Sequence, residues 1–140
     1  MRLDVDASRA RFATAKVARL ASADADGRPH IVPITFAVLG DDRIVTAVDQ
    51  KPKSTPNLRR LRNIRVNPRV SVLADHYSDD WDELWWVRAD GRASILEKPD
   101  GRCPALSTLA EKYPQYRDDP PRGPVIEILV DAWTGWLSRP

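Results

Sequence analysis

The residues best suited to binding chemistry lie in one basic stretch, residues 51–69, which holds seven Lys or Arg residues and no acid. Lys51 and Lys53 stand directly before Thr55-Pro56, which we expect to open a helix, and Ser54 adds a second hydroxyl group. A helix N-terminus offers free N–H groups and the positive end of the helix dipole to an anion. These residue types predict a phosphate site, although a solvated basic turn would have the same composition.

Four arginines continue the positive charge along the expected helix, while Leu58 and Leu61 face inward. They are Arg59, Arg60, Arg62 and Arg65. The pattern fits three roles: holding a longer polyanion, pairing with the acidic stretch 75–83, or only keeping the helix soluble. The residues alone leave all three open.

Five tryptophans stand in the 140 residues: Trp81, Trp85, Trp86, Trp133 and Trp136. Adjacent residues of a strand face opposite sides, so one of Trp85 and Trp86 can fill the core while the other meets a ligand ring or a partner. Together with a phosphate site, such aromatic residues suggest a flat-ringed, phosphorylated cofactor. Core packing and dimerisation would explain the tryptophans equally well.

Other chemistry finds little support in the sequence. It has no glycine-rich nucleotide motif, Walker loop, HExxH or GxSxG pattern. Cys103 is the only cysteine, and His30 and His76 stand alone, so we expect neither a disulfide nor a metal site. A net charge of +2 gives no argument for nucleic-acid binding. No signal peptide or membrane-length apolar run is present, which predicts a cytoplasmic protein without a membrane partner.

The expected secondary structure is mostly strand. Turn signals at Asp26-Gly27 and Gly40 separate the first three strands, which predicts an antiparallel meander. Pro33 lacks an N–H group and is expected at an edge, a bulge or a strand switch. The expected strands cover residues 16–23, 29–39, 43–48, 69–75, 84–97 and 124–138, and the expected helices are capped by Asp6 or Ser8, opened by Thr55-Pro56, and span residues 105–113.

Two strands carry further detail. Asp90-Gly91 in residues 84–97 marks a hairpin or a bulge. Along residues 124–138, one face is expected to show Ile126, Ile128, Val130 and Ala132, and the other Glu127, Asp131 and Trp133. With a proline-rich loop at 114–124, the chain is expected to form one mainly β domain, 1–140: a six- to seven-stranded antiparallel barrel with short helices.

Three segments, in this order, resemble the pyridoxamine 5'-phosphate oxidase-like split β-barrel family, and within it the deazaflavin-dependent oxidoreductases that use coenzyme F420. The segments are ARLASADADGRPHIVPITF (18–36), KPKSTPNLRRLRNIRVNPRVSVL (51–73) and WWVRADGRASI (85–95). The resemblance implies an FMN-binding type of split barrel that forms a homodimer with cofactor sites at the subunit interface. It matches no motif in residues 99–124.

The resemblance also implies which residues form the site. The cofactor phosphate would be held by Lys51, Lys53, Ser54 and Thr55. The backbone around Pro33, Ile34 and Thr35 would lie along the ring, flanked by Arg19, Leu20, Ala21 and Ser22. Trp85 or Trp86, with Arg88, would come from the other subunit, and Trp136 is a further candidate for the ring wall.

The implied activity is hydride transfer between the deazaflavin and a small electron-poor organic substrate, with water, Tyr77 or Ser22 as proton donor. Lys-Pro-Lys-Ser-Thr-Pro replaces the Ser-Arg-Lys type of motif that is common in flavin-using members, which favours F420 and leaves FMN open. An FMN-dependent oxidase or reductase and a non-catalytic cofactor carrier are the alternatives.

Overall fold

A computed structural model describes residues 1–48 and 58–139. The strands are β1 (Arg2–Leu3), β2 (Ala18–Ala23), β3 (Pro29–Ile34), β4 (Ala37–Leu39), β5 (Arg43–Ala47), β6 (Arg69–His76), β7 (Trp85–Leu96) and β8 (Val125–Leu137). The helices are α1 (Val5–Thr14), α2 (Arg59–Val66), α3 (Pro99–Lys112) and α4 (Pro114–Asp118), with a 3-10 turn, η1 (Trp81–Glu83).

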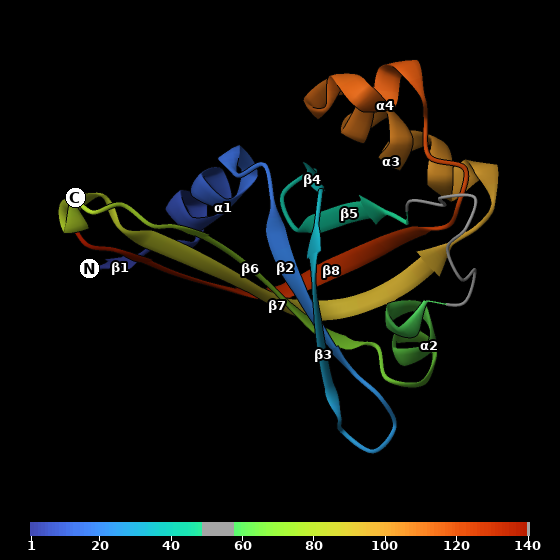
Figure 1. Ribbon diagram of the computed structural model, residues 1–140, viewed down its shortest axis with the longest axis horizontal. Helices are drawn as coiled ribbons and strands as arrows, with labels where there is room; N and C mark the ends of the chain where they lie inside the picture. The colour runs from blue at the N-terminus through green and yellow to red at the C-terminus, as the bar shows by residue number, and fades with distance from the viewer. Residues whose placement is uncertain (49–57, 140) are drawn as a thin grey trace.

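Within the described residues the eight strands form one sheet in the order β3-β2-β6-β7-β8-β5-β4, with β1 added on β8. Every pair is antiparallel. The first and last strands of this order, β3 and β4, follow each other in the chain, so the sheet curls back on itself (Figure 1). The prediction of a mainly β antiparallel barrel with short helices is confirmed.

Residues 29–39 do not form one strand, as expected, but two. Strand β3 ends at Ile34 and β4 begins at Ala37, on opposite sides of the curled sheet. Pro33 lies on the edge strand β3, next to this change of partner, where its missing N–H group breaks no ladder in the sheet interior. This division and the short strand β1 bring the count above the expected six or seven.

The Asp90-Gly91 signal marks a β-bulge and not a hairpin: Gly91 pairs with Val130 and Asp90 with Ala132, which leaves Asp131 as the extra residue. An extra residue shifts the alternation of side chains by one. The expected faces of residues 124–138 are therefore right up to Asp131, which is exposed, and wrong for Ala132 and Trp133. Trp133 packs against the core, whereas Ala132 is exposed.

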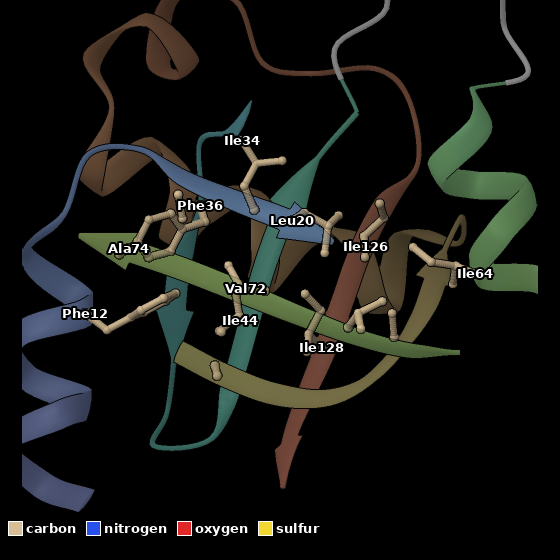
Figure 2. Packing of buried hydrophobic residues seen from close by; sticks show 14 of the residues in the cluster. Phe12, Leu20, Ile34, Phe36, Ile44, Ile64, Val72, Ala74, Ile126 and Ile128 are labelled. Atoms are coloured by element: carbon tan, nitrogen blue, oxygen red, sulfur yellow. The ribbon is translucent and has the colours of Figure 1, made fainter. Parts of the chain in front are cut away.

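The main core lies inside the curl of the sheet (Figure 2). Leu20, Phe36, Ile44, Val72, Val87 and Ile128 are fully buried there. Helix α1 closes one side through Phe12, whose ring lies 4.7 Å from that of Phe36 and 5.3 Å from that of Trp133, measured between centroids. Helix α2 contributes Leu61 and Ile64. The sequence periodicity had placed Leu61 inward and Ile128 on one face of the last strand, and both are in the core.

The helix boundaries differ from the expected ones. Asp4 caps α1 by accepting a hydrogen bond from the Ala7 N–H group at 2.8 Å, in place of Asp6 or Ser8. Helix α2 begins at Arg59, after the extended residue Leu58. Thr55-Pro56, which were expected to open it, lie outside the described residues. Helix α3 begins at Pro99, earlier than the expected start at residue 105. A proline is tolerated there because the first helical turn needs no N–H donor from it.

The proline-rich segment after α3 contains helix α4 where a loop was expected. Helices α3 and α4 form a unit at one end of the barrel (Figure 1). Ala105, Leu109 and Tyr113 pack there on Val45 and Val125 in a second core. None of the described helices combines the length and apolar character that a membrane-spanning helix requires.

Candidate functional site

A hollow of about 630 Å³ lies on the outer face of the sheet, opposite the main core. The cross-strand registers build it in rows. Asp75, Trp86 and Trp136 stand side by side in one row, on β6, β7 and β8. The next row includes Leu73 and Arg88. Arg19 and Ala21 of β2 extend the wall toward β3.

Aromatic rings form much of this wall. Trp86 and Trp136 are directly paired neighbours, and the Trp136 side chain is 37% exposed. Trp85 points to the other side of β7 and packs against the main core, although its edge still borders the hollow. The prediction that Trp85 and Trp86 face opposite sides is confirmed, and Trp86 is the one that faces outward.

Two ion pairs flank the aromatic wall. The Arg19 guanidinium lies 3.6 Å from the Asp75 carboxylate, and Arg88 donates a hydrogen bond from Nε to Asp90 at 3.0 Å. Ser71 donates its hydroxyl proton to the other oxygen of Asp90 at 2.6 Å, so the carboxylate that holds Arg88 is itself held in place. The partners of both pairs are partly exposed, and such pairs contribute little to stability. They therefore remain available to a ligand.

Two further polar side chains border the hollow. The His76 ring stacks on Trp85 with 6.5 Å between centroids, and Tyr77 is 68% exposed. Sequence reasoning missed His76, Asp75, Asp90 and Ser71 as site residues. The alternation that makes Ser71, Asp75 and Asp90 face outward was readable, but only the pairing of β6 with β7 brings these three together. His76 lies on the other side of β6, with Trp85.

The structure brings together six of the residues that the resemblance assigned to the site. They are Arg19, Ala21, Trp85, Trp86, Arg88 and Trp136. Pro33 is exposed and pairs with Arg19, so it lies beside this group. Lys51, Lys53, Ser54 and Thr55 lie outside the described residues.

The side chains of three other assigned residues point away from the hollow. Leu20 is fully buried, and Ile34 and Ser22 are 6% and 5% exposed. The Ser22 hydroxyl accepts a hydrogen bond from Asn63 Nδ2 at 3.1 Å, under helix α2. A ligand on the outer face could meet these residues only through their backbone.

Helix α2 places its arginines around the turn between β2 and β3. Arg59 and Arg62 line a smaller cleft with Asp24 and Asp26 of that turn. Arg65 lies 3.6 Å from the Glu97 carboxylate and not beside the acidic stretch 75–83. That stretch pairs instead with Arg19, through Asp75, and with Arg139.

Burial governs the ionisation of the groups near α2. Desolvation lowers the pKa of the half-buried Arg60 guanidinium. Desolvation, followed by the positive charges of Arg59 and Arg60, lowers the pKa of His30. Protonating His30 would place a third cation beside the two arginines. The imidazole is therefore expected to stay neutral at neutral pH.

The sequence pattern of the pyridoxamine 5'-phosphate oxidase family matches residues 5–137 of the chain. No curated protein matches the chain. Among solved structures, a conserved hypothetical protein from Mycobacterium tuberculosis is 23% identical, with a TM-score of 0.78 over 98% of this chain and 86% of that one. An FAD-binding protein from Mesorhizobium loti is 24% identical, with a TM-score of 0.72 over 96% and 95%.

The heme storage protein HutZ from Vibrio cholerae is 21% identical, with a TM-score of 0.71 over 98% of this chain and 95% of that one. At these identities the three structures show a shared fold and no shared activity. The match of the family pattern covers nearly the whole chain, from helix α1 to the end of strand β8. The chain belongs to the pyridoxamine 5'-phosphate oxidase family and has its split β-barrel fold.

Proposed function

We propose that the protein binds a flavin-type ring cofactor, coenzyme F420 in the first place, and serves as an oxidoreductase for a small electron-poor substrate. The single observation that carries the proposal is the outer-face hollow of about 630 Å³ between Trp86, Trp136 and the two arginines Arg19 and Arg88. Ligand pockets of this size are mostly apolar with a few polar groups that fix orientation, and this hollow has that composition.

The residues present fit a flat, largely uncharged ring. Trp86 and Trp136 supply aromatic faces against which a ring can stack. Arg19 and Arg88 are balanced by Asp75 and Asp90, so the hollow carries little net charge. The phosphate is assigned by the resemblance to Lys51, Lys53, Ser54 and Thr55.

When bound in its reduced form, the cofactor would supply the hydride, and the protein would contribute orientation and a dry environment. Hydride addition to an electron-poor substrate leaves an anion that needs one proton. Tyr77 borders the hollow, whereas Ser22 is buried under helix α2, so Tyr77 is better placed to deliver that proton. Water is the alternative donor.

The arginines of α2 support F420 over FMN. F420 carries an oligoglutamate tail, which FMN lacks, and Arg59 and Arg62 line a cleft that could receive carboxylates. A flavin remains the second candidate, because two of the similar structures are named as FAD-binding proteins. A non-catalytic carrier would have the same ring site and no turnover.

Titration of the purified protein with oxidised F420, FMN, FAD and hemin separates these candidates. Quenching of the wall tryptophans reports binding, and mixing reduced F420 with quinone, imine and activated-alkene acceptors reports turnover. We expect the tightest binding for F420. Tight FMN or FAD binding without F420 binding would transfer the proposal to a flavin, and hemin binding alone, for which His76 is the available ligand, would refute it.

A further inference from the structure

The short link between β3 and β4, Thr35–Phe36, is held by a part of the chain for which the sequence offered no function. The hydroxyl oxygen of Tyr113 accepts a hydrogen bond from the Phe36 N–H group at 3.1 Å. The same hydroxyl lies 2.9 Å from the Lys16 carbonyl oxygen and 3.0 Å from that of Phe36, and its single proton is shared between them. One side chain thus ties the link to the start of β2.

A second tyrosine holds the other residue of the link. The hydroxyl of Tyr116 lies 2.7 Å from that of Thr35. From the opposite side, Thr46 of β5 donates its hydroxyl proton to the Thr35 carbonyl oxygen at 2.7 Å. Thr35 is therefore fixed at both its side chain and its backbone.

The two tyrosines stand on a rigid corner. Tyr113 ends α3 and precedes Pro114, the first residue of α4, and its ring meets that of Tyr116 edge to face at 5.6 Å between centroids. Ala105 and Leu109 anchor α3 in the second core. Burial, the largest influence, raises the pKa of the Tyr113 hydroxyl, so this group stays protonated at neutral pH and can donate.

We propose that Tyr113 and Tyr116 are positioning residues, through which the α3–α4 unit fixes the backbone of β3 and its link to β4 for a bound cofactor ring. The inference rests on the proposed function, together with the resemblance, which implies that the ring lies along the backbone of Pro33, Ile34 and Thr35. Pro33 pairs with Arg19, which lines the hollow. Among the described strands β3 pairs with β2 alone, so no second strand supports the end of β3 at Ile34. The tyrosine contacts take the place of that second strand.

The test measures cofactor binding and local backbone order in the same proteins. Tyr116→Phe removes one hydroxyl and keeps the ring against Tyr113, so we expect the fold to persist. Thr108→Ala is the matched control: its hydroxyl donates to the Pro104 carbonyl within α3 and makes no contact with the link among the described residues. Tyr113→Phe completes the set, although it leaves buried backbone groups without a partner and is expected to lower stability as well.

Losing one neutral hydrogen bond corresponds to about a three- to tenfold change in an equilibrium constant. We expect Tyr116→Phe to weaken binding of F420, or of FMN if that is the cofactor, by about this factor, and to shift the visible absorption of the bound ring. Faster hydrogen exchange of the Phe36 amide is expected in Tyr113→Phe. Thr108→Ala should match the wild type in all three measurements.

The outcomes separate the two proposals. Wild-type binding together with unchanged affinity and spectrum in Tyr116→Phe would overturn the positioning role and leave the proposed function standing. If the wild type binds none of the ring cofactors, the proposed function fails and the positioning role fails with it, even where Phe36 exchange shows that the contacts exist. Equal weakening in Thr108→Ala would also overturn the role, because the effect would not be specific to the link.

Discussion

At the scale of single residues, the tryptophans show how position decides what one residue type does. Trp86 and Trp136 wall the outer hollow, while Trp133 packs on Phe12 and donates its indole N–H to Asp42 at 2.9 Å. Trp81 stands 68% exposed on η1 and touches neither site nor core. These differences give a direct test of the ring site.

Trp86→Ala is expected to weaken cofactor binding by roughly 2- to 12-fold, because stacking against an aromatic ring contributes about 0.5–1.5 kcal/mol. Trp81→Ala is the matched control and should bind as the wild type does, since Trp81 does not line the hollow. Titration followed by cofactor absorbance measures both without depending on the number of tryptophans. Equal affinity of Trp86→Ala and wild type would place the ring elsewhere.

Lys112 is the residue whose ionisation the fold perturbs most visibly. Its Nζ is buried, has no hydrogen-bond partner in the described part of the chain, and lies 3.8 Å from the centroid of the Phe36 ring. Desolvation, with a smaller contribution from Lys16, lowers its pKa from 10.5 to about 8. The folded protein therefore loses this proton at a lower pH than the unfolded chain does.

The sign of the resulting pH dependence follows from linkage. Between pH 8 and 10.5 the unfolded chain binds more protons at Lys112 than the folded protein, so this group makes stability rise with pH across that window. Because the side chain is only half-buried, we expect about 1–2 kcal/mol rather than the full value of the shift. Urea unfolding of wild type and Lys112→Met at pH 7, 8, 9 and 10 should show the difference growing in favour of the wild type. Parallel curves would contradict the assignment.

At the scale of elements, the pairing of β7 with β8 decides the shape of the barrel wall. The bulge at Asp131 moves Trp133 to the core face and bends two long strands where the outer rows of the hollow begin. Gly91 sits opposite this bulge. A Cβ added there would fall well inside van der Waals distance of the Leu129 carbonyl group, which is backbone and cannot turn aside.

Gly91→Ala is therefore expected to lower the free energy of unfolding by about 2–4 kcal/mol, as overpacked core positions do. Gly101→Ala is the control, because its Cβ would meet only the Leu96 side chain at 3.4 Å and alanine favours a helix. Thermal unfolding of both variants provides the measurement. A variant Gly91→Ala as stable as the wild type would show that β7 and β8 can separate there at little cost.

At the scale of the whole molecule, the outer face of the sheet exposes large apolar side chains around the hollow. Ile31 is 64% exposed and lines the same hollow as Trp136, Arg19 and Arg88. Contiguous apolar surface with a polar rim is typical of interaction sites. The homodimer implied by the family resemblance would cover this face.

We predict a dimeric mass for the wild type by light scattering after gel filtration, and a shift toward monomer for Ile31→Asp, which would bury a charge in the interface. Val5→Asp is the control: Val5 is also exposed, at 47%, but lies in the first turn of α1, where an acid is favourable. A monomeric wild type would refute the predicted dimer. A dimeric Ile31→Asp would move the interface to another face.

Much of the fold could be read from the sequence, because turn residues and alternation are local signals. The Asp-Gly turn after β2 and the edge position of Pro33 follow from backbone sterics. The start of α2 at Arg59 was not readable, since no side chain caps it. Local signals cannot report what packing alone decides.

The sequence by itself determined an antiparallel barrel and the pair of opposite-facing tryptophans, Trp85 and Trp86, because both depend on the period of a strand. Only the tertiary structure decided which of the two faces the hollow, since that depends on which side of β7 meets the core. The tertiary structure also decided that Tyr113 and Tyr116 reach the Thr35–Phe36 link. Tyr113 and Phe36 are 77 residues apart in the sequence, and Tyr116 and Thr35 are 81 residues apart. No periodicity in a chain encodes such pairs; the packing of α3 on the barrel creates them.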